Sequence, residues 1–372
     1  MMKELPVKAW LMTALRALPT LFLTMSVTVS VSAKEYLLTG VKPDQLALID
    51  PAARQVERTY TIPDAGTGVL TLVNSADGKR AYALVNRWES VSGIDLDTGE
   101  QVFRADFSTL ERRIKATFAM DLSPDGKELY VYQLPVRRLP DSYQVEDTYI
   151  AVYDTSAGLD AKPVRTFPAP RRTAILATST DGSKLYAISW DVTILDAQTG
   201  RTLGSHRLRN WARPDYSEPD VLGIWPQWEQ TGIYTNPYYA VRTDLSPDDP
   251  AAYKTGIFAL DLASDDFRVM DFEDTSAIIF SSVVNPANRD EAFGVYTTLS
   301  KIDMAAGKLL KRVDLDHTYY TVNISGDGKE VYVGGTMDDI AVYDSSSLEK
   351  IGTIKIESGN DMALSSLRII HR

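Results

Sequence analysis

Short apolar segments rich in β-branched and aromatic residues alternate with polar turns from about residue 34 to the C-terminus. Residues 175–207 show the repeating unit most clearly. Apolar segments 175–179 and 185–189 flank the turn Asp181-Gly182-Ser183-Lys184, and segment 192–196 is followed by a turn at 198–200 and a fourth segment, 202–207. Apolar runs of this length, bounded by glycine and aspartate, predict four antiparallel strands.

The third segment of each unit ends in a hydrophobic residue followed by aspartate, and this pair recurs seven times. The pairs are Ile49-Asp50, Ile94-Asp95, Tyr153-Asp154, Leu195-Asp196, Leu260-Asp261, Ile302-Asp303 and Tyr343-Asp344, with spacings of 45, 59, 42, 65, 42 and 41 residues. Repeats of about 40 to 50 residues are typical of propeller blades, because each small sheet buries its faces only against its neighbours. The pattern therefore predicts an all-β, seven-bladed β-propeller with four-stranded blades.

The two ends of the repeat region complement each other. The first unit after residue 33 shows only three strands, 36–39, 46–50 and 56–62, whereas residues 362–370 follow the complete seventh unit and have no blade of their own. We expect these N- and C-terminal strands to pair in one blade. Such pairing closes the ring and covers strand edges that would otherwise promote aggregation.

The turn between the first two strands often contains Asp-Gly, as at Asp77-Gly78, Asp125-Gly126 and Asp327-Gly328. This pair suits a turn that requires a positive φ, at which glycine has no Cβ penalty. The fifth and sixth units lack it, so we expect those two blades to diverge.

Residues 1–33 do not fit the repeat. Lys3, Lys8 and Arg16 form a basic start, residues 17–30 carry no charge, and Val31-Ser32-Ala33 supplies small residues before Lys34. An uncharged segment this short cannot span a bilayer as a helix, so it is typical of a secretory signal peptide, with an uncleaved anchor as the alternative. We expect residues 1–33 to be removed, and residues 34–372 to form the propeller in the periplasm without membrane attachment.

Composition narrows the functions further. The formal net charge is −11, and it becomes −13 without residues 1–33, which carry three cations and one anion. A chain this acidic has no long-range attraction for nucleic acid. Cysteine is absent, so the chain cannot form a disulfide, attach a c-type haem through C-x-x-C-H or carry a cysteine–tryptophan quinone cross-link.

Four long insertions, 105–117, 133–148, 208–221 and 242–254, fall between second and third strands or between blades. In a four-stranded blade these connections emerge on one face, which we call the loop face, and such loops often bind partners. This face is rich in residue types enriched at protein interfaces: Trp88, Arg112, Arg113, Arg137, Arg138, Tyr143, Trp211, Tyr216, Tyr238, Tyr239, Tyr253, Tyr319 and Tyr320. The alternative is that these side chains cover blade edges.

The sequence contains no self-sufficient catalytic or metal-binding motif. The three histidines lack metal-ligand spacing: His206, His317 and His371. For His317, a structural hydrogen bond and a general-base role both stay open. Two acidic runs lack the calcium-loop pattern: Asp244 with Asp248 and Asp249, and Asp338 with Asp339. We expect no metal, no cofactor and no catalytic residue on this chain.

Four features together carry a resemblance to a known family: the signal segment, the seven blades with Asp-Gly-Lys turns, the lack of cysteine, and the stretch Gly223-Ile224-Trp225-Pro226-Gln227-Trp228. In these features the sequence resembles the β subunit of bacterial quinohemoprotein amine dehydrogenase. The resemblance spans essentially all of residues 34–372. Wider kin include the heavy chain of methylamine dehydrogenase and related periplasmic propellers. The blade motifs are specific for that superfamily, and only the whole-chain similarity points to this subunit.

The resemblance implies a periplasmic heterotrimer that oxidises primary amines. In that family, a small subunit carries cysteine tryptophylquinone, a larger subunit carries two c-type haems, and a copper protein or cytochrome c accepts the electrons. The propeller subunit holds no redox group and helps enclose the quinone pocket, which must be largely dry so that the Schiff base is not hydrolysed early. We nominate seven residues as pocket wall or subunit interface: Trp88, Tyr143, Trp211, Tyr216, Tyr238, Tyr239 and Tyr319.

Two other functions stay open. One is a free-standing periplasmic binding propeller whose loop face holds a peptide, a cell-wall fragment or DNA, although the acidic charge argues against DNA. The other is a lactonase-like hydrolase, which needs a base and a cation that converge at the central channel.

Overall fold

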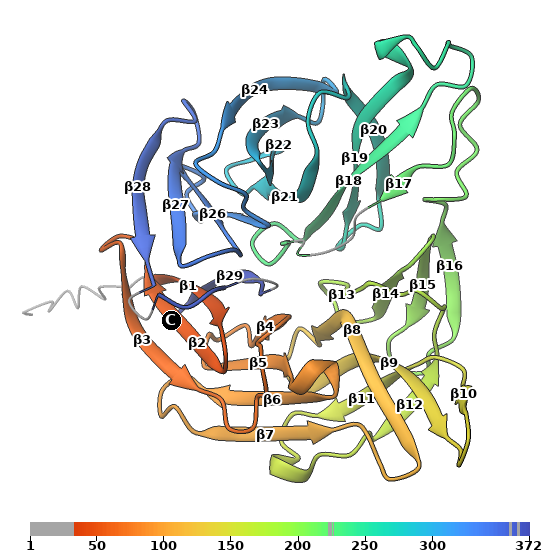
Figure 1. Ribbon diagram of the computed structural model, residues 1–372, viewed down its shortest axis with the longest axis vertical. Coiled ribbons are helices and arrows are strands. Elements are labelled where there is room, and N and C mark those ends of the chain that lie inside the picture. The colour runs from red at the N-terminus through yellow and green to blue at the C-terminus, as the bar shows by residue number, and fades with distance from the viewer. Residues whose placement is uncertain (1–32, 222–224, 226, 357–358, 363–364) are drawn as a thin grey trace, which may run out of the picture. The chain divides into compact units, whose positions relative to one another are not determined.

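Seven antiparallel sheets follow one another along Lys34–Arg372 and surround a central axis (Figure 1). The computed structural model describes residues 33–221, 225, 227–356, 359–362 and 365–372. The predicted seven-bladed β-propeller with four-stranded blades is confirmed. The predicted signal peptide lies outside the described residues except for Ala33, so its cleavage stays a prediction.

Within each blade the strands run in order from the innermost strand to the outermost one. Blade one contains β29 (Leu367–His371), β1 (Glu35–Val41), β2 (Gln45–Asp50) and β3 (Gln55–Thr61). Blade two contains β4 (Leu72–Asn74), β5 (Arg80–Val85), β6 (Ser90–Asp95) and β7 (Gln101–Asp106). Blade three contains β8 (Arg112–Leu122), β9 (Glu128–Arg138), β11 (Tyr149–Asp154) and β12 (Arg165–Pro168), with β10 (Tyr143–Val145) as a fifth strand. Blade four contains β13 (Ile175–Thr178), β14 (Lys184–Ile188), β15 (Val192–Asp196) and β16 (Thr202–His206).

The other three blades follow the same order. Blade five contains β17 (Asp220–Val221), β18 (Ile233–Val241), β19 (Tyr253–Asp261) and β20 (Phe267–Asp274). Blade six contains β21 (Ile279–Asn285), β22 (Asn288–Tyr296), β23 (Thr298–Asp303) and β24 (Lys308–Asp314). Blade seven contains β25 (Thr321–Ile324), β26 (Glu330–Gly334), β27 (Asp339–Asp344) and β28 (Lys350–Lys355). Single turns of 3-10 helix occur at η1 (Asn86–Trp88), η2 (Gly158–Asp160) and η3 (Pro250–Ala252).

The apolar core lies between the blades. Seven clusters of buried side chains each join two neighbouring blades; for example, Tyr82 of blade two and Met120 of blade three share one cluster. Stability therefore comes from packing between neighbouring sheets, as expected for repeat architectures.

The hydrophobic-Asp pairs recur because the aspartate closes the turn after the third strand. Asp95 accepts the backbone N–H groups of Asp97 and Thr98 at 2.9 Å each, and Asp344 does the same for Ser346 and Ser347 at 3.0 and 2.7 Å. The other five aspartates of the pairs, Asp50, Asp154, Asp196, Asp261 and Asp303, make equivalent bonds. Short polar side chains stabilise turns in this way.

The terminal strands close the ring as predicted. β29 pairs with β1 over five residue pairs, from Glu35 opposite His371 to Thr39 opposite Leu367. Lys34 and Arg372 also exchange two backbone hydrogen bonds, of 2.8 and 3.0 Å. Blade one therefore combines both ends of the described chain.

Two insertions that we expected to be loops are largely strands. β8 begins at Arg112, inside insertion 105–117, and β9 continues to Arg138, inside insertion 133–148. The two strands pair with each other and β9 also pairs with β10, so the inserted backbone groups satisfy one another. We call residues 112–116, 134–138 and 143–145 the blade-three ribbon; its strands lie at the lower right of Figure 1.

None of the helices in the described parts of the chain is long and apolar enough to cross a membrane.

Candidate functional site

The seven nominated aromatic residues do not form one surface. Tyr238 and Tyr319 are buried, four others are half-buried, and only Tyr143 is well exposed, at 76%. The structure brings Trp211, Tyr216 and Tyr238 together. Tyr239 follows Tyr238 on β18 but bonds to blade six, and the other three nominated residues belong to blades two, three and seven. Their proposed role as wall or interface stays a prediction.

Trp211, Tyr216 and Tyr238 surround one ion pair in blade five. The Trp211 ring lies edge-on to both tyrosines, with centroids 6.0 and 5.1 Å away. The guanidinium of Arg213 lies 3.8 Å from the centroid of the Tyr216 ring and donates to both carboxylate oxygens of Asp271, at 2.9 and 2.8 Å. This cluster fixes the 208–221 segment on the β18–β20 sheet.

Asp271 is the centre of that cluster. Burial opposes its ionisation, but the hydrogen bonds from Arg213, Tyr216 and Tyr238 outweigh this effect and hold the pKa of Asp271 below its usual value. Burial and the hydrogen bond to Asp271 raise the pKa of Tyr238. The carboxylate is fully occupied and both phenols stay protonated at neutral pH, so this arrangement holds structure together rather than transferring protons.

Tyr239 and Tyr319 have similar structural roles. The Tyr239 hydroxyl donates to the Ile279 carbonyl at 3.1 Å and joins blade five to blade six, and burial raises the pKa of Tyr239 to about 12. The Tyr319 hydroxyl donates to Asp339 at 2.8 Å, and the other carboxylate oxygen of Asp339 lies 2.8 Å from Nε2 of His317.

His317 has both ring nitrogens occupied, since Nδ1 lies 2.9 Å from the carbonyl oxygen of Thr318. With neither nitrogen directed at open space, the structural hydrogen bond is the better interpretation of His317.

Trp88 lies in η1 at the loop face. Its ring is half-buried and faces the ammonium group of Lys115, 5.3 Å from the ring centroid. Beside it, Glu89 accepts two hydrogen bonds from Arg113, at 2.8 and 2.6 Å. These contacts fasten the base of the blade-three ribbon to blade two.

A second group of aromatic residues comes from segments on or near the first two strands of blades three, five, six and seven. We call Phe118, Trp225, Phe280, Tyr296 and Tyr320 the axial aromatic cluster. The Trp225 ring stacks on Tyr320 at 5.2 Å, and Phe280 stacks on Tyr296 at 3.8 Å. The Phe118 ring also contacts Trp225, with ring centroids 5.9 Å apart. The sequence analysis named only Tyr320 of these five as a loop-face residue. It missed the cluster as a whole because the members come from four different blades.

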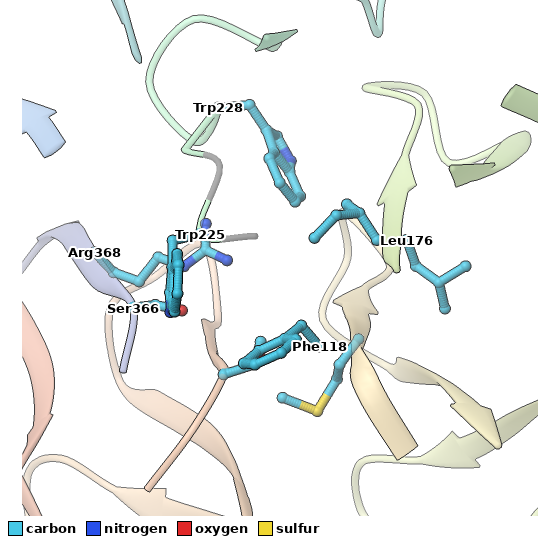
Figure 2. A pocket seen from close by; sticks show the side chains of 9 residues that line it. Phe118, Leu176, Trp225, Trp228, Ser366 and Arg368 are labelled. Atoms are coloured by element: carbon cyan, nitrogen blue, oxygen red, sulfur yellow. The ribbon is translucent and has the colours of Figure 1, made fainter. Parts of the chain in front are cut away.

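The axial pocket lies next to this cluster. Figure 2 shows Phe118, Trp225, Trp228 and Leu176 around it, with Ser366 and Arg368 at its side. Its cavity measures about 10 Å³, which is room for about one water molecule. A lactone substrate does not fit this pocket, so the structure gives no support to the hydrolase hypothesis here.

Arg368 and Glu229 together connect four blades beside the axial pocket. On β29 of blade one, its Nε donates to the Leu72 carbonyl at 2.9 Å and its guanidinium pairs with Glu229 at 3.2 Å. Glu229, which precedes β18, also accepts from the Asn323 side chain at 2.8 Å and from the Ile369 backbone at 3.0 Å. Only 7% of the Arg368 side chain is exposed. This network fixes the closing strand from the inside of the ring.

Asp121 on β8 lies near the same network. Its carboxylate accepts the Thr178 backbone N–H at 2.7 Å. Burial raises the pKa of Asp121 to about 6, although the hydrogen bonds and the charge of Arg368 oppose this effect.

In the described parts of the chain, no group of three or more histidine, aspartate or glutamate side chains is placed to bind a metal ion. The acidic runs noted in the sequence are engaged elsewhere. Asp244 pairs with Arg242, Asp249 caps η3 and Asp339 binds His317 and Tyr319.

Comparison with known proteins supports the fold. No protein-family model and no curated protein matches this chain. Hydrazine synthase from Kuenenia stuttgartiensis is similar over 84% of this chain and 89% of its own, with 14% identity and a TM-score of 0.52. A functionally unknown protein from Desulfotomaculum acetoxidans DSM 771 is similar over 90% and 99%, with 11% identity and a TM-score of 0.58.

A third structure, apo AztD from Citrobacter koseri, covers 92% of this chain and 99% of its own at 14% identity, but its TM-score of 0.48 is too low to carry an argument. The first two similarities are distant and show the propeller fold alone. None of the three structures is named as an amine dehydrogenase, so the finer resemblance stays a proposal.

Proposed function

We propose that this chain is a non-redox propeller subunit of a periplasmic quinohemoprotein amine dehydrogenase, in which its loop face docks on the other subunits and helps enclose the quinone pocket. In this proposal the quinone-bearing small subunit and the dihaem cytochrome c subunit are its partners. A copper protein or cytochrome c accepts electrons from the complex.

One observation carries the docking role: exposed apolar side chains gather on a protruding part of the loop face. The blade-three ribbon and its turn expose Leu139, Tyr143 and Val145 by 42%, 76% and 65%, and Leu110 just before it is 94% exposed. Apolar side chains that gather at one site mark interaction surfaces more often than scattered ones do. The axial pocket, in contrast, has room for about one water molecule.

Amine turnover tests the amine dehydrogenase part of the proposal. Periplasmic extracts of the native host, grown on a primary amine, are assayed for amine-dependent dye reduction with and without the gene for this chain. We expect deletion to abolish turnover and plasmid-borne chain to restore it. Unchanged turnover in the deletion strain contradicts the proposal.

The second candidate is a free-standing binding propeller, and the face opposite the loops offers one specific observation for it. Ser123, Asp125, Glu128, Tyr130, Asp181 and Gln198 line a groove of about 380 Å³ between blades three and four. That volume lies within the range of small-molecule sites. Full amine turnover without the chain would favour this candidate.

A further inference from the structure

The blade-three ribbon has a free edge. In its three-stranded part the order is β8, β9 and β10, and β10 ends the sheet, with no other strand beside it in the described parts of the chain. Soluble proteins usually protect such edges by keeping the strand very short, as β10 is with three residues, or with charged residues, proline or a covering segment. β10 has the sequence Tyr143-Gln144-Val145 and contains neither a charge nor a proline.

One face of the ribbon is an apolar hollow bordered by cations. Val136 of β9 lies opposite Arg113 of β8 and opposite Val145 of β10. These three side chains are therefore on the same face of the ribbon. Arg113, Lys115, Leu134, Val136 and Tyr143 line a hollow of about 370 Å³ there. Arg138 lies opposite Tyr143 and is exposed.

The charge of the ribbon is opposite to that of the whole chain. Residues 110–117 and 133–146 contain five cations (Arg112, Arg113, Lys115, Arg137 and Arg138) and three carboxylates (Glu111, Asp141 and Glu146), a net charge of +2. The whole sequence has a net charge of −11. Arg112 and Arg137 share Glu146, and Arg113 pairs with Glu89 of blade two. Arg138 pairs with no carboxylate that the structure describes.

The cationic surface continues onto blade four. Arg171 donates to the Glu146 carbonyl at 3.2 Å, directly after β10. Next to it, Arg172 lies over one ring of Trp190 at 4.4 Å, and Arg209 lies over the same ring at 5.1 Å. Trp190 is 45% exposed. Stacked arginine and tryptophan side chains are common anchors for protein partners.

We propose that β10 accepts an extended segment of a partner protein as an additional strand, and that this segment alternates apolar and carboxylate side chains. Main-chain hydrogen bonds at the free edge would supply affinity, and the alternating side chains would supply specificity. The apolar side chains cover Val136, Tyr143 and Val145, and a carboxylate meets Arg138. A second copy of this chain is a poor occupant, because two ribbons of net charge +2 repel each other. The inference rests on the proposed docking function and adds the place and the chemistry of docking.

A site-specific cross-link tests the position and the partner. The full chain carries photoreactive p-benzoylphenylalanine at Tyr143, or at Leu203 as a control on the outer strand β16, which is 42% exposed. After irradiation in the native host, the linked peptide is sequenced by mass spectrometry. We expect Tyr143 to link to an extended segment with alternating apolar and acidic residues, and Leu203 not to do so. Equal linking at both positions, a link to a second copy, or a link to a basic segment overturns the proposal.

A matched pair of variants tests the chemistry with defined probes. The probes are a ten-residue peptide that alternates glutamate and valine, and the same peptide methylated on alternate backbone nitrogens. Arg138→Glu with Val145→Glu should weaken binding of the first peptide at least about tenfold. Lys329→Glu with Leu203→Glu makes equivalent changes at exposed positions outside the ribbon and should leave binding unchanged. The methylated peptide should bind no variant, and equal binding of both peptides to the unaltered chain contradicts strand addition.

The outcomes separate this inference from the proposed function. If haem and quinone partners co-purify with the chain but Tyr143 links no better than Leu203, the docking site is wrong and the function stands. If Tyr143 links to an acidic segment of a protein without haem or quinone, the docking site stands and the amine dehydrogenase assignment is wrong.

Discussion

At the scale of single residues, aspartates four positions apart in blade three have opposite electrostatic environments. Burial raises the pKa of Asp121 to about 6. The hydrogen bond from the Ser123 hydroxyl and, to a smaller extent, the one from the Lys127 backbone lower the pKa of Asp125 to about 2. The folded state therefore opposes ionisation of Asp121 and favours ionisation of Asp125.

Asp121→Asn should make the protein more stable at neutral pH. Because the folded pKa lies above the unfolded value of about 3.8, the folded chain binds more protons between these values, and stability falls as pH rises from about 4 to 6. Asparagine does not ionise, so the variant does not lose stability in this pH range. Its free energy of unfolding should exceed that of the unaltered chain by up to about 3 kcal/mol at pH 7.5. At pH 4 the two should agree closely. Urea unfolding at both pH values measures this.

Asp125→Asn is the control of opposite sign. In the unaltered chain, the lowered pKa of Asp125 contributes stability above about pH 4, and this contribution is lost as the pH falls toward 2. The variant should therefore be less stable than the unaltered chain at neutral pH and about equally stable at pH 2. If both variants shift stability in the same direction at pH 7.5, the account of Asp121 is wrong.

Gly256→Ala should destabilise blade five. Gly256 lies opposite Tyr238 across β18 and β19, and an added Cβ would lie 2.0 Å from Cζ of the Tyr238 ring. That ring cannot move freely, because its hydroxyl is bound to Asp271. We expect a loss of about 3 kcal/mol in thermal or urea unfolding. Gly68→Ala is the control, since nothing lies within 4 Å of the added atom; a similar loss there would contradict the packing argument.

Residue roles were only partly predictable from the sequence. The aromatic positions of the loop face could be read from the insertions, but burial could not. Tyr238 and Tyr319 are buried, and their hydroxyl groups donate hydrogen bonds to Asp271 and Asp339, which lie 33 and 20 residues further along the chain. Nothing local in the sequence identifies such partners.

At the scale of elements, strand alternation predicted the blades and the closing pair, but not the blade-three ribbon. Segment 192–196 corresponds to β15 residue for residue, and the terminal strands pair as expected. Together, insertions 105–117 and 133–148 contain arginine, proline and glutamate, so their sequences do not show the apolar pattern from which a strand is predicted. They form strands because each finds its partner in the other.

Ring closure should depend on Arg368 as well as on the β1–β29 ladder. Arg368→Met keeps the strand but leaves Glu229 without its ion pair in the interior. Removing one partner of a buried ion pair is strongly destabilising, so we expect a loss of about 3 kcal/mol in urea unfolding. Arg171→Met, at an exposed pair with Asp147, should change stability by less than about 0.5 kcal/mol. Equal effects would contradict the role of the axial network.

Removal of residues 366–372 should have a larger effect. It deletes β29, exposes the edge of β1 and removes Arg368 together with its bonds to blades two and five. We expect the truncated chain to aggregate and to lose its cooperative thermal transition, as followed by light scattering and circular dichroism. A soluble truncated chain with an unchanged transition would show that the ring does not need this strand.

At the scale of the whole molecule, the repeat made the fold predictable, whereas the axial site was not. Each blade repeats the same turn chemistry, so one sequence pattern identified all seven. The axial aromatic cluster and the Arg368 network instead combine residues from different blades, and only closure of the ring brings them together. The resulting molecule has an aromatic cluster near its axis, an acidic overall charge and a cationic ribbon on blade three.

The central claim, that this chain works by docking in an amine-oxidising complex, is tested most directly by its mass in the native periplasm. The tagged chain is isolated from the native host grown on a primary amine and analysed by native mass spectrometry, with haem and quinone stains of the separated subunits. The account predicts one copy of this chain with a haem-positive large subunit and a quinone-positive small one. A chain that is recovered alone, or only with partners that lack both groups, would contradict it.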